Sequence, residues 1–291
     1  MAIYSATLFS KEFQLLNLKV AEETKGGVDK VFVAECERTF RNGPKDLILK
    51  GHPDCPSNVE VVEVLGSEFD AVEDNDQLML AYRREGIQRD APFRAMSLKD
   101  DDVVICADVD EIFPSSDIPM IAEEARKRGF VHLLQHNFLY KLNWVQDSFW
   151  GSAFAITGQF LNMGLGIQRM RVQTGSKILT DGKHFGYLMS PEEIAEKLRG
   201  FPPCFEQKYE EIGSIQQAMD QKSDPFGRSV KLHPVTMASG RYPDSIIQHL
   251  GDWKEFIDED AETALQDVEM NPVVEFYFNS WENRKYDELY G

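Results

Sequence analysis

Residues 103–112 decide the fold, and they read Val103-Val104-Ile105-Cys106-Ala107-Asp108-Val109-Asp110-Glu111-Ile112. Five apolar residues lie between acidic clusters, a pattern typical of a strand that is buried on both faces at the centre of a sheet. Asp108 and Asp110 follow this strand directly. Because ligands of open α/β sheets bind outside the carboxyl ends of the strands, the stretch predicts a polar site at the end of a buried strand.

Strand-like and helix-like patterns alternate through the first 115 residues. This alternation predicts a largely parallel sheet covered by helices. An arginine-rich helix at 77–96 is expected to begin at a cap formed by Asn75 or Asp76. The other elements expected in this half are strands at 3–9, 28–34 and 59–64 and a helix at 12–23.

The second half has a looser pattern, without internal repeats or a low-complexity linker. It is therefore expected to wrap onto the first half rather than to form a separate domain. The expected elements are strands at 130–134 and 136–150, a helix from Pro191 to Leu198 that Ser190 caps, and a helix from Trp253 to Val268 in the acidic tail.

The charge of the chain excludes several classes of partner. The 291 residues include 49 acidic and 31 basic ones, a formal net charge of −18, which repels nucleic acid and anionic lipid surfaces. No stretch approaches the ~20 apolar residues that cross a bilayer, so we expect a soluble, cytoplasmic protein. Cys36, Cys55, Cys106 and Cys204 lack metal-site spacing and are expected to be free thiols in a reducing compartment.

Asp108 and Asp110 form a D-x-D pattern. Residues two apart in an extended segment project to the same side, so their carboxylates converge. Such hard oxygen ligands suit Mg²⁺ or Mn²⁺, whose open positions accept water and diphosphate oxygens. On the pattern alone, an acidic strand-end loop without a metal is the alternative. A second match, Asp258-Glu259-Asp260, lies in a polar stretch expected to be helical and is set aside.

Four stretches of the sequence carry recognisable patterns when taken in order: residues 4–16, residues 28–45, an E-x-x-Q-R pattern from Glu85 to Arg89, and residues 104–114. Together they resemble glycosyltransferase family 17, whose animal members add a bisecting N-acetylglucosamine to the core mannose of N-glycans. The resemblance covers roughly residues 3–200. A weaker match at 181–188 resembles a G-W-H-F-S segment, with Lys183 where the family has tryptophan.

The resemblance implies an α/β fold of GT-A-like, Rossmann-like type, with a mixed, mostly parallel sheet flanked by helices. Combined with the pattern of the second half, it predicts a transferase domain at 1–250, with a nucleotide-sugar half at about 1–115 and an acceptor half at about 116–250. The acidic tail at 251–291 is expected to form a C-terminal helical extension packed on the same domain. The implied reaction is a metal-dependent, inverting transfer of a sugar, N-acetylglucosamine in the family, from a UDP-sugar to a glycan hydroxyl.

The resemblance also implies roles for residues that would contact the donor. Glu35 and Arg38 match the family at a strand end and are expected near the base or ribose, with a surface salt bridge as the alternative. Arg84 and Arg89 are five apart and so lie on different faces of a helix, whereas Glu85 and Arg89 are neighbours. Arg89 is expected to approach the diphosphate and Glu85 to orient it, with an ordinary helix ion pair as the alternative. Asp108 completes this donor-binding set.

His184 is expected to be a further metal ligand beside Asp108 and Asp110, or to touch the donor phosphate, although a lone histidine is often structural. Asp181 and Glu111 are the candidates for the base that removes the acceptor proton. The aromatic side chains of residues 144, 149 and 150 suit either a sugar-stacking platform or core packing, and core packing is the favoured interpretation.

Two other functions fit the D-x-D pattern. In a phosphatase of the haloacid dehalogenase type, Asp108 would be the nucleophile, but that pattern usually lies near the N-terminus. A non-catalytic sugar-nucleotide-binding protein on a decayed transferase fold is the other alternative, and the retained E-x-x-Q-R and D-V-D-E stretches argue against it.

Overall fold

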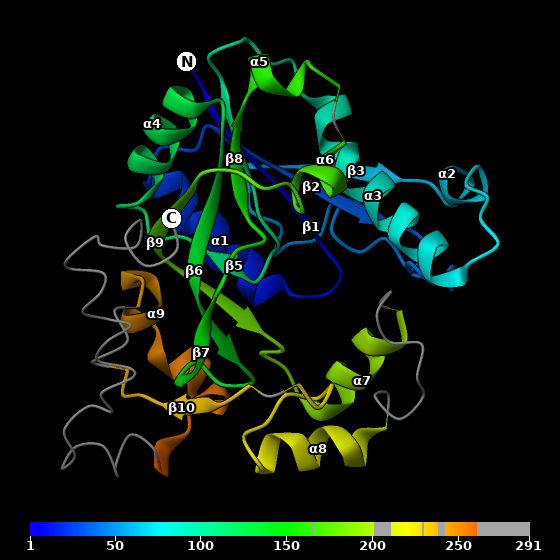
Figure 1. The fold of residues 1–291 in the computed structure, drawn as a ribbon. Helices are drawn as coiled ribbons and strands as arrows, with labels where there is room; N and C mark the ends of the chain where they lie inside the picture. The colour runs from blue at the N-terminus through cyan, green and yellow to red at the C-terminus, as the bar shows by residue number, and fades with distance from the viewer. Residues whose placement is uncertain (165, 201–210, 229, 238–241, 261–291) are drawn as a thin grey trace.

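The computed structural model describes residues 1–164, 166–200, 211–228, 230–237 and 242–260. Within these residues ten strands form one mixed sheet, in the order β10-β7-β6-β8-β4-β1-β2-β3, while β9 pairs with both β5 and β6. In Figure 1 the parallel strands and α3 occupy the upper part of the view, and β7, β10, α7 and α8 the lower part. The expected α/β class, with a mixed sheet whose core strands are parallel and flanked by helices, is confirmed.

The N-terminal half follows the sequence pattern closely. Its four strands pair in parallel in the order β4-β1-β2-β3. Asp76 caps α3 as expected, because its carboxylate accepts hydrogen bonds from the amides of Leu78 and Met79. Strand β2 begins two residues later than predicted. The elements are β1 (Ile3–Leu8), α1 (Phe13–Lys25), β2 (Lys30–Cys36), β3 (Val59–Val64), α2 (Gly66–Asp70), α3 (Gln77–Ala95) and β4 (Val103–Cys106).

Helices cover both faces of this parallel sheet. The apolar side of α1, with Leu15, Leu16 and Val20, shares one core cluster with Val103 and Ile105 of β4. Helix α3 contacts β1, β2 and β3 from the other face. The buried central strand predicted from residues 103–107 is confirmed, because every residue of β4 is buried.

The second half adds mostly antiparallel strands. It contains β5 (Glu111–Ile112), α4 (Ile118–Arg128), β6 (Phe130–Leu139), β7 (Trp144–Trp150), β8 (Phe154–Thr157), α5 (Gly158–Leu161), α6 (Ile167–Met170), β9 (Lys177–Gly186), α7 (Pro191–Gly200), α8 (Ile212–Asp220), β10 (Leu232–Pro234), α9 (Asp244–Gln248) and a 3₁₀ helix, η2 (Leu250–Phe256). Ser190 caps α7 as predicted, because its hydroxyl oxygen accepts a hydrogen bond from the Glu193 amide.

One strand prediction is wrong. Residues 136–150 are not a single strand, because the chain reverses between Leu139 and Trp144 to form the antiparallel pair β6 and β7. Tyr140 makes this turn in a left-handed conformation with φ 65°, and its hydroxyl group donates to the Ser223 carbonyl oxygen. The aromatic sequence has high β-propensity throughout and no glycine or proline to mark the turn.

The C-terminal prediction is tested only in part. Residues 250–256 form a 3₁₀ helix, with Trp253 buried against the core of the parallel half. The predicted helix continues to Val268, and from residue 261 onward it lies outside the described residues. No helix in the described ranges combines the length and the apolar character needed to cross a membrane. Cys36, Cys55 and Cys106 are free thiols, and Cys204 lies outside the described residues.

A buried ion pair ties α1 to the strand end that carries the aspartates. Lys19 and Glu23 lie four residues apart on α1 with an Nζ–Oε1 distance of 2.8 Å, and both side chains are almost completely buried. Lys19 Nζ also donates to the backbone oxygen of Glu111 at 3.0 Å, while Glu23 accepts from the Ser5 hydroxyl at 3.0 Å. The pair therefore joins α1, β1 and β5.

Lys19→Met is expected to lower the free energy of unfolding by about 3–5 kcal/mol, because it leaves the Glu23 carboxylate buried without its cation. Urea denaturation measures this loss. The double variant Lys19→Met/Glu23→Leu removes both charges and should recover most of it. A loss below ~1 kcal/mol in the single variant would contradict this role for the pair.

Candidate active site

Asp108 lies directly after β4 between two arginines. Its carboxylate accepts hydrogen bonds from Arg89 Nη1 of α3 at 2.5 Å and from Arg171 Nη2, just after α6, at 3.0 Å. Burial opposes ionisation of Asp108, but the guanidinium groups of Arg171 and Arg89 outweigh it and hold the pKa of that carboxyl well below its usual range. Asp108 is therefore a fixed anion in a two-arginine clamp.

The E-x-x-Q-R pattern has a direct structural explanation. Glu85 and Arg89 lie one helical turn apart, and Arg89 Nη2 donates to Glu85 at 2.7 Å while Nη1 contacts Asp108. Gln88 donates from its side-chain amide to the Ala34 carbonyl oxygen of β2 at 2.9 Å. The glutamine anchors α3 to the sheet, and the glutamate aims the arginine at the strand end.

Asp110 faces two nitrogen atoms from the second half of the chain. His184 Nε2 of β9 is 4.0 Å from Asp110 Oδ1, and Lys197 Nζ of α7 is 3.5 Å from Oδ2. Strand β9 is fixed here because the Phe185 amide donates to the Asp110 carbonyl oxygen at 2.8 Å and His184 pairs with Glu111.

A hydrogen-bond chain sets the tautomer of His184. Asn137 donates its side-chain amide to Gln146 Oε1 at 2.8 Å, so its Oδ1 accepts from His184 Nδ1 at 2.7 Å. The lone pair of the ring is then on Nε2, the nitrogen that faces Asp110. Burial lowers the pKa of His184 against the opposing effect of Asp110, and Trp150 stacks on the ring at 4.1 Å. A neutral, oriented imidazole of this kind is suited to bind a metal.

The residues present fit an open divalent-cation site. Asp110 offers carboxylate oxygen and His184 offers a free Nε2, while Asp108 is occupied by its arginines. No group of three or more His, Cys, Asp or Glu side chains gathers for a metal within the described residues. Two protein ligands leave the remaining positions to water and substrate phosphate, as Mg²⁺ sites commonly do.

The sequence model of glycosyltransferase family 17 matches residues 1–215. The chain belongs to this family. No curated protein sequence matches the chain.

Three solved structures are similar to the chain at low identity. Rv0371c from Mycobacterium tuberculosis H37Rv has 8% identity and a TM-score of 0.35, and the match covers 62% of this chain and 90% of that one. The galactosyltransferase LgtC, solved with donor and acceptor sugar analogues, has 12% identity and a TM-score of 0.30 over 58% and 62%. Mannosyltransferase PcManGT from Pyrobaculum calidifontis, solved with GDP-Man and Mn²⁺, has 11% identity and a TM-score of 0.35 over 98% and 81%.

The two candidate bases of this glycosyltransferase occupy different places. Glu111 is fully buried, and its carboxylate accepts from the Asp108 amide and from Trp150 Nε1, both at 2.5 Å. Asp181 lies instead in the irregular part of β9, where its amide donates to Asp117 at the start of α4 at 2.6 Å. Glu111 is therefore hydrogen-bonded to the Asp108 strand end, and the backbone of Asp181 is hydrogen-bonded to the start of α4.

Three residues expected at the nucleotide have structural partners elsewhere. The Glu35 carboxylate is fully buried and accepts from the amides of Ile48 and Leu49 at 2.9 and 3.0 Å, so it organises that loop. Arg38 forms a surface ion pair with Asp70 at 2.6 Å, the alternative left open by the sequence. Arg84 donates to the Phe40 carbonyl oxygen at 3.1 Å.

Sequence reasoning missed the two basic residues that complete the site, Arg171 and Lys197. Neither residue lies in one of the stretches that carry the family resemblance. No spacing along the chain links either residue to the strand end that carries Asp108 and Asp110. Trp150, a candidate for a sugar-stacking platform, stacks on the His184 ring. Trp144, by contrast, is part of a core cluster, as favoured from the sequence.

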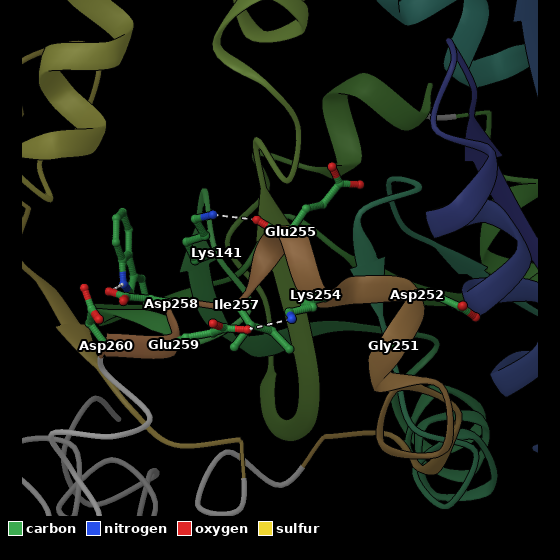
Figure 2. Close-up of a pocket in the computed structure, with 10 residues that line it drawn as sticks. Lys141, Gly251, Asp252, Lys254, Glu255, Ile257, Asp258, Glu259 and Asp260 are labelled. Atoms are coloured by element: carbon green, nitrogen blue, oxygen red, sulfur yellow. Dashed lines mark hydrogen bonds and ion pairs between the residues drawn. The ribbon is translucent and has the colours of Figure 1, made fainter.

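A larger hollow lies away from this site. It has a volume of about 830 Å³ and is lined by residues of η2, the segment after it, Lys141 and Trp144. Figure 2 shows Asp258 among the residues that line this hollow, and the Trp144 indole Nε1 donates to Asp258 Oδ2 at 2.8 Å. Asp108, Asp110 and the side chains that contact them do not line this hollow. The volume of a hollow therefore does not by itself identify the candidate active site.

Burial, and then the nearby Asp108, raise the pKa of Glu111 to about 7, whereas an unfolded glutamate titrates near ~4.3. At a pH between these two pKa values, Glu111 has lost its proton in the unfolded chain but keeps it in the folded chain. Stability from this group is therefore complete below the lower value and is lost as pH rises toward 7, by up to ~1.4 kcal/mol per pH unit.

Glu111→Gln should remove this contribution. Urea unfolding of the variant and the wild type between about pH 5 and about pH 8 is expected to show the variant gaining stability relative to the wild type up to pH 7, with no further change above it. A difference that is constant across the range would contradict the raised pKa.

Proposed function

We propose that this family 17 glycosyltransferase is metal-dependent and inverting, and that it moves a sugar from a UDP-sugar to a glycan hydroxyl. The observation that carries the proposal is that the Asp110 carboxylate and the Nε2 lone pair of His184 face each other at 4.0 Å near the end of β4. These two residues would hold Mn²⁺ or Mg²⁺. Bound there, the ion would neutralise charge on the departing nucleotide diphosphate. N-acetylglucosamine is the sugar that the family resemblance favours.

Charge at the site supports a metal requirement. Asp108, Asp110, Glu85 and Glu12 supply four carboxylates, and Arg89, Arg171 and Lys197 supply three cations. With Glu111 largely protonated below pH 7, four negative and three positive charges leave one net negative charge. A diphosphate entering this field is repelled unless a further cation accompanies it.

The donor would lie over the ends of β1 and β4. Thr7, Leu8 and Ala107 line a very small cavity there together with Arg89 and Arg171. Arg171 lines this space while it contacts Asp108, so we infer that donor entry draws Arg171 away from Asp108 and toward the diphosphate. A guanidinium group pairs well with either anion.

Glu111 is the stronger of the two base candidates. Its pKa of about 7 lies where general bases work efficiently, whereas Asp181 is held beside α4. Because Trp150 Nε1 occupies one carboxylate oxygen, Glu111 would reach an acceptor hydroxyl only after the indole moves. This assignment also explains why Trp150 lies between Glu111 and His184.

Asp110→Asn should weaken metal-dependent binding of the UDP-sugar at least about tenfold, because it removes a charged ligand from the proposed ion. Isothermal titration with a panel of UDP- and GDP-sugars, first with Mn²⁺ and then with EDTA, measures this and names the donor. Asp260→Asn, in the second D-x-D match, is the matched control and should bind like the wild type. Undiminished Mn²⁺-dependent binding by the Asp110 variant would sink the proposed site.

A further inference from the structure

Lys197 brings a cation to the carboxylate that the proposed metal would use. Its Nζ lies 3.5 Å from Asp110 Oδ2 and 3.3 Å from Glu12 Oε1. The two oxygens of Asp110 are therefore divided between Lys197 and His184, whose Nε2 is 4.0 Å from Oδ1. The carboxylates of Glu12 and Asp110 beside the same Nζ favour the charged amine, which is also the ordinary state of a lysine at neutral pH. The side chain is a permanent ammonium ion at this site.

We propose that Lys197 is a tethered cation that competes with the divalent ion for Asp110 and turns to the donor diphosphate when metal and donor bind together. This inference rests on the proposed metal site. An ammonium group at 3.5 Å and a divalent ion bound to the same carboxylate repel each other, so the ion binds Asp110 well only when Lys197 moves away.

The lysine can move without disturbing the fold. Helix α7 is anchored by Ile194, Ala195 and Leu198, which pack in a core cluster with Tyr140 and Trp144. The Lys197 side chain itself is 28% exposed, and its long, flexible stem carries three donors that can reorient.

The carboxylate that Lys197 leaves behind keeps other partners. Glu12 Oε2 accepts from the backbone amides of Ser10 and Lys11 at 3.2 and 2.9 Å, so departure of the ammonium group does not strand it. Asp110 in turn gains the metal. Each anion is thus satisfied in both arrangements.

This arrangement couples the two ligands. Metal alone displaces Lys197 from Asp110 without offering it a new anion, whereas metal with a nucleotide diphosphate supplies one. The two ligands then bind with positive cooperativity, because both favour the arrangement in which Lys197 has left Asp110 and contacts the diphosphate.

The test uses the full chain, Mn²⁺ alone, and UDP at saturating Mn²⁺. Lys197→Met is expected to bind Mn²⁺ alone about two- to fivefold more tightly, since a competing ion pair of this kind is lost. The same variant should bind UDP with Mn²⁺ at least about threefold more weakly, since the diphosphate loses a charged partner. Free Mn²⁺ measured by electron paramagnetic resonance and calorimetry of UDP give the two constants. A purely structural role would not move them in opposite directions.

Two further variants sharpen the comparison. Lys11→Met removes an exposed ion pair with Glu196, which lies on α7 next to Lys197. This variant should leave both binding constants unchanged. Lys197→Arg keeps the charge and should hold Mn²⁺ affinity near that of the wild type. Urea unfolding of each variant establishes that it is folded.

The failures are distinguishable. If the wild type binds Mn²⁺ with UDP but Lys197→Met binds Mn²⁺ alone no more tightly, the lysine does not compete and this inference is overturned, while the metal site stands. If the wild type binds UDP equally well in EDTA, or binds no Mn²⁺ at all, the proposed metal dependence falls and this inference falls with it.

Discussion

The end of β4 concentrates three acidic side chains within four residues, and the structure is organised around compensating them. Asp108, Asp110 and Glu111 follow a fully buried strand, where unpaired carboxylates would be strongly destabilising. Each is compensated differently: Asp108 by two guanidinium groups, Asp110 by the ammonium group of Lys197, and Glu111 by protonation, since its pKa is raised to about 7. A buried site can keep its anions only with such partners.

These partners come from elements far apart in the chain, and this explains why the second half wraps onto the first. Arg89 comes from α3, Arg171 follows α6, His184 lies on β9 and Lys197 on α7. Lys19 adds a contact from α1 to the Glu111 carbonyl oxygen. Neither half alone supplies a neutralised strand end. At this convergence we propose that a diphosphate, a cation and movable basic side chains meet, despite a formal charge of −18 over the whole chain.

Trp150 and Asn137 show how side chains outside the aspartate motif prepare it. Asn137 fixes the tautomer of His184 through its own bond to Gln146. Trp150 stacks on the same ring and donates to Glu111. One indole therefore touches both the metal-binding histidine and the candidate base that we propose, so movement of Trp150 would change both at once. Orientation of ligands by such neighbours is general in metal sites.

The sequence by itself determined the parallel half: β1, α1, β3, α3 and β4 lie within a residue or two of their predicted ranges, because apolar periodicity and helix caps are local signals. It also placed Glu85 one turn from Arg89. Only the tertiary structure decided that the Glu35 carboxylate accepts hydrogen bonds from a neighbouring loop and that residues 136–150 form two antiparallel strands. It also decided that Arg171 contacts Asp108 and Lys197 contacts Asp110. The physical reason is that a charge finds its partner through space, and no spacing along the chain records that distance.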